Sequence, residues 1–114
     1  MAIAQNIIIN SDADYLKQFT AKDDTGTVID LTGYTVAAQL RKTYASSTAT
    51  TFAAVKVSDV LGTFTLALTD TQTATGTLER GRHVYDVTIT LDSSGDIIRI
   101  QEGIATVSPS VTRT

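Results

Sequence analysis

The 114-residue chain contains no cysteine, no tryptophan and a single proline, Pro109. Without cysteine it can form neither disulfides nor thiolate metal sites. With only one proline, the strands are free to pair along nearly the whole chain. No apolar run approaches the roughly 20 residues that span a bilayer, so we expect no membrane segment.

Positive charge is also in short supply. Nine Lys and Arg residues face twelve Asp and Glu residues, and the net charge is −3. Because phosphate contacts need clustered Lys and Arg, this balance argues against a nucleic-acid partner. The seven glycines are scattered singly, so no glycine-rich phosphate loop indicates a nucleotide or another small-molecule substrate. The residues after Met1 lack the basic start of a signal peptide, and we expect synthesis without one.

The chain is rich in threonine, valine and isoleucine. These β-branched residues suit a pleated surface and lose rotamer freedom in helices, so the composition favours sheet. The length is that of one domain with a single core, which we place at residues 1–114.

The stretch 30–41 shows the organisation most clearly. Asp-Leu-Thr-Gly forms a turn signal, and the glycine, Gly33, can adopt backbone angles that other residues avoid. Beyond it, Tyr34, Val36, Ala38 and Leu40 alternate with polar or small residues, which is typical of a half-buried strand.

Comparable patterns recur along the chain, and turn signals separate them. The sequence predicts one short helical turn near residues 70–76, a bulge beside Leu16 and a bend or bulge at Gly103. Eight or nine short strands favour an all-β fold, an Ig-like antiparallel β-sandwich, with a closed barrel as the alternative. The strands are expected at residues 7–10, 15–21, 27–31, 34–41, 51–57, 63–69, 81–91, 96–101 and 104–107.

Candidates for chemistry are few. The one histidine, His83, lies on the apolar side of its expected strand, where a structural histidine is commoner than a catalytic base. The acidic pairs Asp12 with Asp14 and Asp23 with Asp24 lie in turns, which turn chemistry explains. The second pair lacks the alternating acidic pattern of a calcium loop. We therefore expect no enzyme, no catalytic residue, no cofactor and no metal.

Aromatic residues offer little material for stacking a base or a sugar. Tyr34 and Tyr85 fall on apolar strand faces and are expected in the core. Tyr44 falls in the low-complexity stretch 43–50, which is expected to be an exposed loop. A carbohydrate-binding β-sandwich for attachment to a host surface stays open as the alternative function.

Four segments in order resemble small structural proteins of tailed-bacteriophage virions. They are residues 24–35 (DTGTVIDLTGYT), 62–69 (GTFTLALT), 78–87 (LERGRHVYDV) and 102–112 (EGIATVSPSVT). The same order occurs in the N-terminal β-sandwich domains of upper baseplate proteins, which hold receptor-binding fibres. His83 departs from the pattern, which commonly has an aromatic residue at that position.

The resemblance implies a non-enzymatic virion protein, made in the host cytoplasm, that acts as an assembly or decoration module in the head, neck or tail and baseplate. The partners it implies are other virion proteins and copies of the chain itself in a symmetric assembly. Residues 1–10 are a candidate partner-pairing strand because edge strands invite pairing, and residues 108–114 are expected to be a tail. The candidate interface residues are Ile3, Ile7, Ile8, Ile9 and Tyr44.

Overall fold

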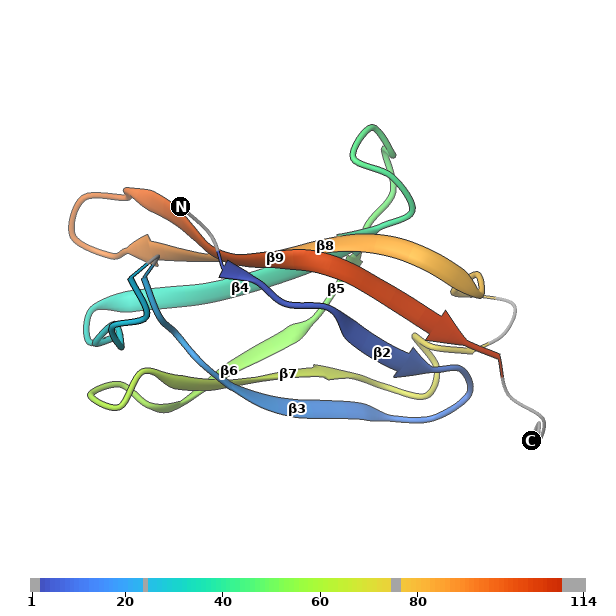
Figure 1. The fold of residues 1–114 in the computed structure, drawn as a ribbon, viewed down its shortest axis with the longest axis horizontal. Helices are drawn as coiled ribbons and strands as arrows, with labels where there is room; N and C mark the ends of the chain where they lie inside the picture. The colour runs from blue at the N-terminus through green and yellow to red at the C-terminus, as the bar shows by residue number, and fades with distance from the viewer. Residues whose placement is uncertain (1–2, 24, 75–76, 110–114) are drawn as a thin grey trace.

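Two β-sheets make up the structure, a computed structural model that describes residues 3–23, 25–74 and 77–109 (Figure 1). Within these ranges the chain forms nine strands and no helix, which confirms the all-β prediction. The strands are β1 (Ile3–Ala4), β2 (Ile7–Asn10), β3 (Tyr15–Thr20), β4 (Tyr34–Arg41), β5 (Thr50–Thr51), β6 (Ala53–Ser58), β7 (Thr63–Leu68), β8 (Gly81–Leu91) and β9 (Ile97–Ser108).

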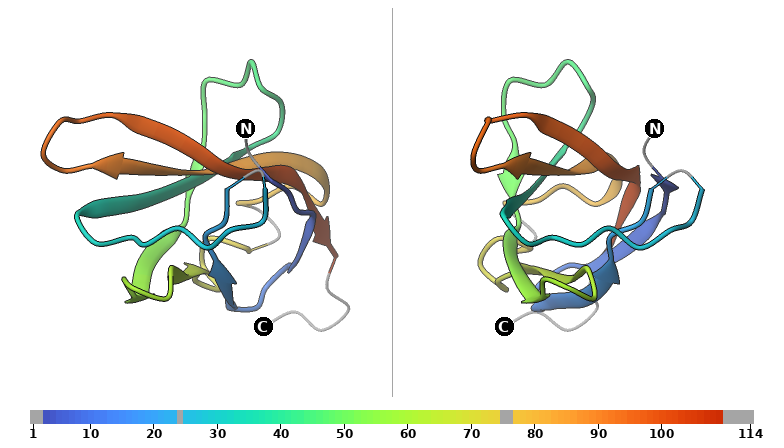
Figure 2. Two further views of the ribbon diagram at one scale, coloured as in Figure 1. Left: turned by 60° about the vertical axis from the view of Figure 1, so that its left-hand side comes forward. Right: turned by 90° about the vertical axis from the view of Figure 1, so that its left-hand side faces the viewer.

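The larger sheet, here sheet A, has the order β1-β9-β8-β4-β5, and β2 also pairs with β9. Sheet B has the order β3-β7-β6. The end-on view in Figure 2 shows the two sheets facing each other. All pairs are antiparallel except β1 and β2, which run parallel to β9, so the expected antiparallel pairing is wrong for these two strands. The reason is that β2 leads through a turn into sheet B and is not half of a hairpin.

The core lies between the sheets and follows the predicted alternation. Val36, Ala38 and Leu40 on β4 are buried, as are their counterparts on the neighbouring strand β8. Tyr34, at the outer end of β4, is half-buried and packs against the core. The remaining core side chains of the long strands are Phe64, Leu66, Leu68, Tyr85, Val87 and Ile89.

Three local predictions are wrong. Residues 27–31 form no strand but only an isolated bridge between Lys22 and Val28, because turns there use the backbone groups. Residues 70–73 form turns, residues 70–74 contain no helix, and residues 75–76 lie outside the described part of the chain. Thr73 instead donates its hydroxyl to the carbonyl of Ala13 at 2.7 Å. No bulge occurs beside Leu16, which points to solvent from a regular ladder.

The last strand also differs from the prediction. β9 is continuous, and its bulge lies at Ile100, where Val87 pairs with Gln101 but Thr88 pairs with Arg99. The bulge lets the consecutive residues Ile100 and Gln101 both become buried.

Gly103 has a different role from the predicted bend. Its backbone lies against the segment between β1 and β2, and a Cβ at this position would overlap the carbonyl group of Gln5. The absence of a side chain therefore lets the N-terminal strands lie close to β9.

We predict that Gly103→Ala lowers the free energy of unfolding by about 1–3 kcal/mol, because the added methyl group overpacks this contact. The loss should be local as well, with faster hydrogen exchange at the amides of β2. Gly95→Ala is the control, since Gly95 has φ +77° but open space around its Cβ position. It should cost about 1 kcal/mol from backbone strain alone and leave exchange in β2 unchanged. Equal protection of β2 in both variants would contradict the role assigned to Gly103.

Candidate interaction surfaces

The four isoleucines predicted as an interface lie on β1 and β2, but their side chains divide between the core and the solvent. Ile7 and Ile9 are buried in the protein's own core, at 3% and 0% exposure. Ile8 points outward and is 66% exposed, and Ile3 is half-buried. Of these side chains, only Ile8 is presented fully to a partner.

Tyr44 lies in the loop between β4 and β5 and is 81% exposed, as predicted for this loop. The structure does not bring it together with the isoleucines. In the strand order of sheet A, β1 and β2 lie at one edge and β5 at the other. The predicted residues are therefore two separate candidate contacts and not one surface.

The residues considered for chemistry have structural partners. His83 is buried, with Nε2 2.8 Å from the carbonyl oxygen of Glu79 and with Nδ1 lacking a partner in the described part of the chain. Asp14 accepts a hydrogen bond from the backbone amide of Asp70 at 2.8 Å. Asp23 accepts hydrogen bonds from the Thr25 hydroxyl and nearby backbone amides, and these lower the pKa of its carboxyl group. Asp24 lies outside the described residues.

Two buried tyrosine hydroxyls belong to the core. Burial raises the pKa of Tyr15 to about 12, and the neighbouring Tyr85 acts in the same direction. Burial also raises the pKa of Tyr85, while the hydrogen bond from Gln101 acts in the opposite direction. The Tyr85 hydroxyl donates to the carbonyl of Gln5 and so joins β8 to the N-terminal segment.

Two further findings concern the described residues alone. Among them, no three His, Asp or Glu side chains are grouped so that they could hold a metal ion. They also contain no helix long and apolar enough to cross a membrane.

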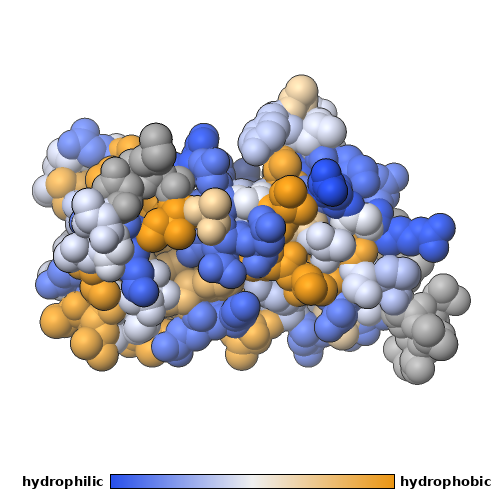
Figure 3. Space-filling model, viewed as in Figure 1, coloured by the Kyte–Doolittle hydropathy of each residue, from blue (hydrophilic) through white to orange (hydrophobic). Residues whose placement is uncertain are grey.

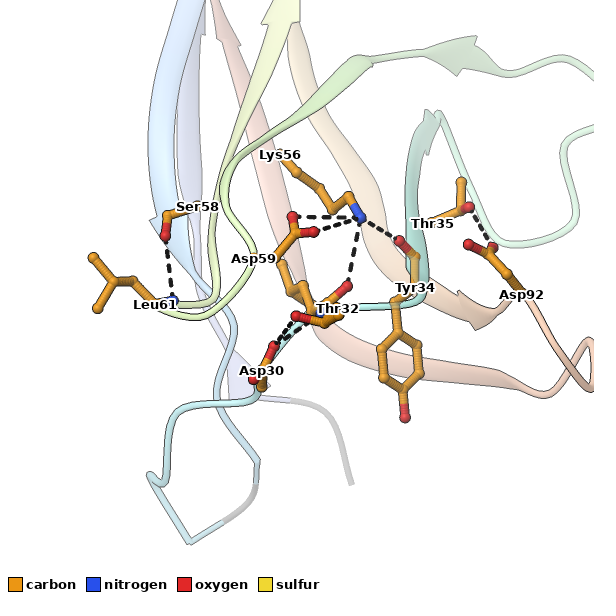
Figure 4. Close-up of polar contacts among 10 residues, drawn as sticks. Asp30, Thr32, Tyr34, Thr35, Lys56, Ser58, Asp59, Leu61 and Asp92 are labelled. Carbon is orange, nitrogen blue, oxygen red and sulfur yellow. Dashed lines mark hydrogen bonds and ion pairs between the residues drawn. The ribbon is translucent and has the colours of Figure 1, made fainter.

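Lys56 on β6 contacts two backbone carbonyls and a carboxylate (Figure 4). Its ammonium group donates to the carbonyl of Tyr34 at 2.8 Å and lies 3.5 Å from that of Leu31. Both carboxylate oxygens of Asp59 lie 3.4 Å away. Lys56 thus connects an edge strand of sheet B to the first residue of β4 in sheet A.

The turn that precedes β4 is held by its own side chains (Figure 4). The Asp30 carboxylate accepts hydrogen bonds from the Thr32 hydroxyl at 2.6 Å and from the Thr32 amide at 2.9 Å. These bonds lower the pKa of the Asp30 carboxyl group, with the hydroxyl contributing most. Leu31, at the centre of the turn, is fully buried. This is the Asp-Leu-Thr-Gly turn predicted from the sequence.

The outward face of sheet A is charged. Arg99 lies 3.4 Å from Asp86 and 3.4 Å from Glu102, and the strand register places all three on the outer side of β8 and β9. A groove of about 260 Å³ runs along this face below Tyr44. Its lining includes Gln39, Arg41, Tyr44, Asp86, Arg99 and Glu102.

The outward face of sheet B, by contrast, carries no charged residue on its three strands. Val55 and Val57 on β6 are 58% and 55% exposed, and Leu16 on β3 is 72% exposed. We call this surface the sheet B outer face. Its members are Leu16, Gln18, Thr20, Ala53, Val55, Val57, Ser58, Thr63, Thr65 and Ala67.

The apolar surface continues around the end of the β6–β7 hairpin. Val60 and Leu61 in the turn of that hairpin are both exposed. Figure 3 shows apolar atoms gathered at the lower left, where Figure 1 places this turn. The exposed apolar residues of the hairpin therefore extend beyond the flat face.

Sequence reasoning predicted the β6–β7 hairpin but not this surface. In the segment Val55-Lys56-Val57, alternation by itself would place the valines inward and the lysine outward. The structure does the opposite, because the ammonium group of Lys56 finds backbone carbonyls on the inner side. The pattern of two valines flanking a lysine therefore predicts that the valines face the core, whereas in the structure they face the solvent.

The sequence matches no model of a known protein family, and it has no significant match among curated proteins.

We predict that Lys56→Met lowers the free energy of unfolding by about 1–2 kcal/mol, because it removes charge-assisted hydrogen bonds to backbone carbonyls. The control is Lys42→Met, since Lys42 lies 4.0 Å from Glu79 with both side chains well exposed. That variant should change stability by less than about 0.5 kcal/mol. Denaturant titration of both variants measures the difference, and equal effects would show that Lys56 does not connect the sheets.

Proposed function

We propose that this chain is a non-enzymatic structural protein of a tailed-phage virion, where it acts as an assembly or decoration module. The observation that carries the proposal is the sheet B outer face, on which two valines and a leucine are exposed and no strand position is charged. Exposed apolar side chains on a sheet face are a feature of many sites where proteins bind other proteins. A rigid sandwich with such a face is suited to making contacts within an assembly.

The resemblance of four ordered sequence segments to phage virion proteins supports the virion setting. Head decoration, neck, and tail or baseplate accessory roles all fit this proposal, with other virion proteins and copies of the chain as partners. The Ile8 side chain and the Tyr44 loop are additional contact points in the proposal, because both are strongly exposed.

We further propose that the sandwich is Ig-like. The order β9-β8-β4 in sheet A and β3-β7-β6 in sheet B corresponds to the G-F-C and B-E-D orders of immunoglobulin domains. The short strand β5 beside β4 corresponds to the extra strand of variable-type domains.

Mass spectrometry of purified particles from the phage that encodes the chain tests the proposed setting. We expect the chain to co-purify with intact particles in a constant ratio to the major capsid protein, because an assembly module occupies symmetric positions. A non-structural protein of the same phage, followed through the same gradient, is the control. Recovery of the chain only in the soluble fraction would contradict the proposal.

A second candidate function is binding of surface glycans by the groove on sheet A. The exposed ring of Tyr44 lies beside hydrogen-bonding groups of Gln39, Arg41 and Glu102, and sugars are bound by such combinations. The other six aromatic residues of the chain are buried or half-buried, so Tyr44 would stack alone. For that reason the assembly role is the better supported of the two.

Glycan binding predicts that purified protein retains specific sugars on a glycan array and that Tyr44→Ala abolishes this retention. Tyr44 is exposed and outside the core, so the variant should unfold at the same temperature as the wild type. An array without specific signals, or signals unchanged in Tyr44→Ala, would contradict this function.

A further inference from the structure

We propose that a cavity between the open edges of the two sheets binds an apolar amino acid whose nitrogen is acylated and whose carboxylate is free. Such a group exists both as a small molecule and as the last residue of a polypeptide, and the chemistry recognised is the same. The site is independent of the proposed assembly role, which does not use this cavity. Three features define it, namely an unpaired oxygen, an apolar wall and an unpaired charge.

The cavity lies where β1 and β9 of sheet A face β3 and the residues that follow it. Its volume is about 260 Å³. Because drug-sized sites occupy roughly 300–1,000 Å³, this cavity suits a ligand about the size of one amino-acid residue. Its lining includes Ile3, Phe19, Thr20, Lys22, Ile100 and Gln101.

The side-chain amide of Gln101 has a fixed orientation. Gln101 is only 6% exposed and faces the space between the sheets, as does Val87 opposite it on β8. Its Nε2 donates to the hydroxyl of Tyr85 at 2.9 Å, and that hydroxyl donates its one proton to the carbonyl of Gln5. The hydroxyl can therefore only accept from Gln101, so Nε2 faces Tyr85 and Oε1 points away from it.

The Oε1 atom of Gln101 is an acceptor open to the cavity. It has no hydrogen-bond partner in the described part of the chain. Among the same residues, the enclosed side-chain atoms that lack a partner are the Tyr15 hydroxyl and Nδ1 of His83, so Oε1 is not enclosed. Since Gln101 is otherwise buried and lines the cavity, Oε1 reaches that space. An unpaired acceptor in such a place favours a ligand that donates an N–H group.

The other lining residues select the rest of the ligand. Phe19 and Ile100 are buried and Ile3 is half-buried, so these three form an apolar wall. Lys22 is the one charged residue of the lining, and its ammonium group makes no ion pair or hydrogen bond with the described residues. An anionic group is its natural complement. An N-acylated amino acid with an apolar side chain carries the donor, the apolar group and the anion around a single carbon atom.

The open edge of β3 offers further contacts if the ligand is the end of a polypeptide. β3 pairs with β7 alone, and the amide of Ala21 donates to the carbonyl of Gly62 at 2.7 Å. Because backbone groups alternate in direction along an antiparallel strand, the amide and carbonyl of Thr20 point to the open edge. Thr20 also lines the cavity, so a peptide can pair with this edge while its last residue fills the cavity.

Titration of isotope-labelled protein with N-acetylleucine, followed by NMR, tests the site. A ligand of about twelve non-hydrogen atoms, bound with the usual efficiency, has a dissociation constant on the order of 1 mM. We expect saturable shifts of the Gln101 side-chain amide and of the backbone amides of Thr20 and Lys22. The ester analogue, in which oxygen replaces the N–H group, should bind roughly fivefold more weakly because it leaves Oε1 unpaired. Absence of saturable shifts up to about 20 mM would overturn the proposal.

Lys22→Met tests the anionic group without changing the core, because Lys22 is exposed. It should weaken binding of N-acetylleucine roughly threefold and leave binding of the uncharged N-acetylleucinamide unchanged. Lys42→Met removes another exposed lysine outside this cavity, and as the matched control it should bind like the wild type. Unchanged affinity of Lys22→Met for the acid, or an equal loss in both variants, would contradict the site.

A tetrapeptide that ends in leucine distinguishes the two sources of the ligand. If the cavity receives the end of a polypeptide, the peptide should bind at least about tenfold more tightly than N-acetylleucine, with an added shift at the amide of Gln18 on the same edge. If the ligand is a small molecule, the two should bind equally. Amidation of the peptide terminus removes the carboxylate and should weaken binding in either case, so tighter binding of the amidated peptide would refute the proposed recognition.

Discussion

The face that β6 presents to solvent depends on one polar contact between the sheets, made by the ammonium group of Lys56. It comes from an edge strand of sheet B and donates to the carbonyl that begins β4 in sheet A. Because this group points inward, the neighbouring valines of β6 must point outward. One half-buried polar contact therefore stabilises the junction of the sheets, and the same orientation of β6 exposes Val55 and Val57. The inward orientation of Lys56 thus accounts both for the polar contact between the sheets and for the exposed valines of β6.

The N-terminal strands lie at the edge of sheet A, yet some of their side chains belong to the hydrophobic core. β1 and β2 run parallel to β9, and Ile7 and Ile9 fill the space between the sheets. Gly103 allows this close approach, and the hydroxyl of Tyr85 fixes the carbonyl of Gln5 beside it. The first strands thus complete the domain, and only outward side chains such as Ile8 are left for a partner.

The two outer faces have opposite character, and this difference bears on function. Sheet A presents ion pairs and a polar groove, which water solvates well, whereas the outer face of sheet B presents only uncharged strand residues. A protein with charged groups on one face and apolar groups on the other presents two chemically different surfaces to its neighbours. Under the proposed assembly role, the uncharged outer face of sheet B would be the one turned toward a neighbouring protein.

The sequence by itself determined the all-β class, the strands β4, β7 and β8 with their buried faces, the exposed loop at Tyr44 and the turn at Gly33. Each of these follows from a period of two or from local turn chemistry, which neighbouring residues specify. Only the tertiary structure decided the face of β6, the parallel docking of β2 and the loss of a strand at residues 27–31. Those outcomes depend on partners outside the segment itself, such as the carbonyl of Tyr34 for Lys56 and the carbonyl of Asp59 for the amide of Leu31, and no local pattern encodes such contacts.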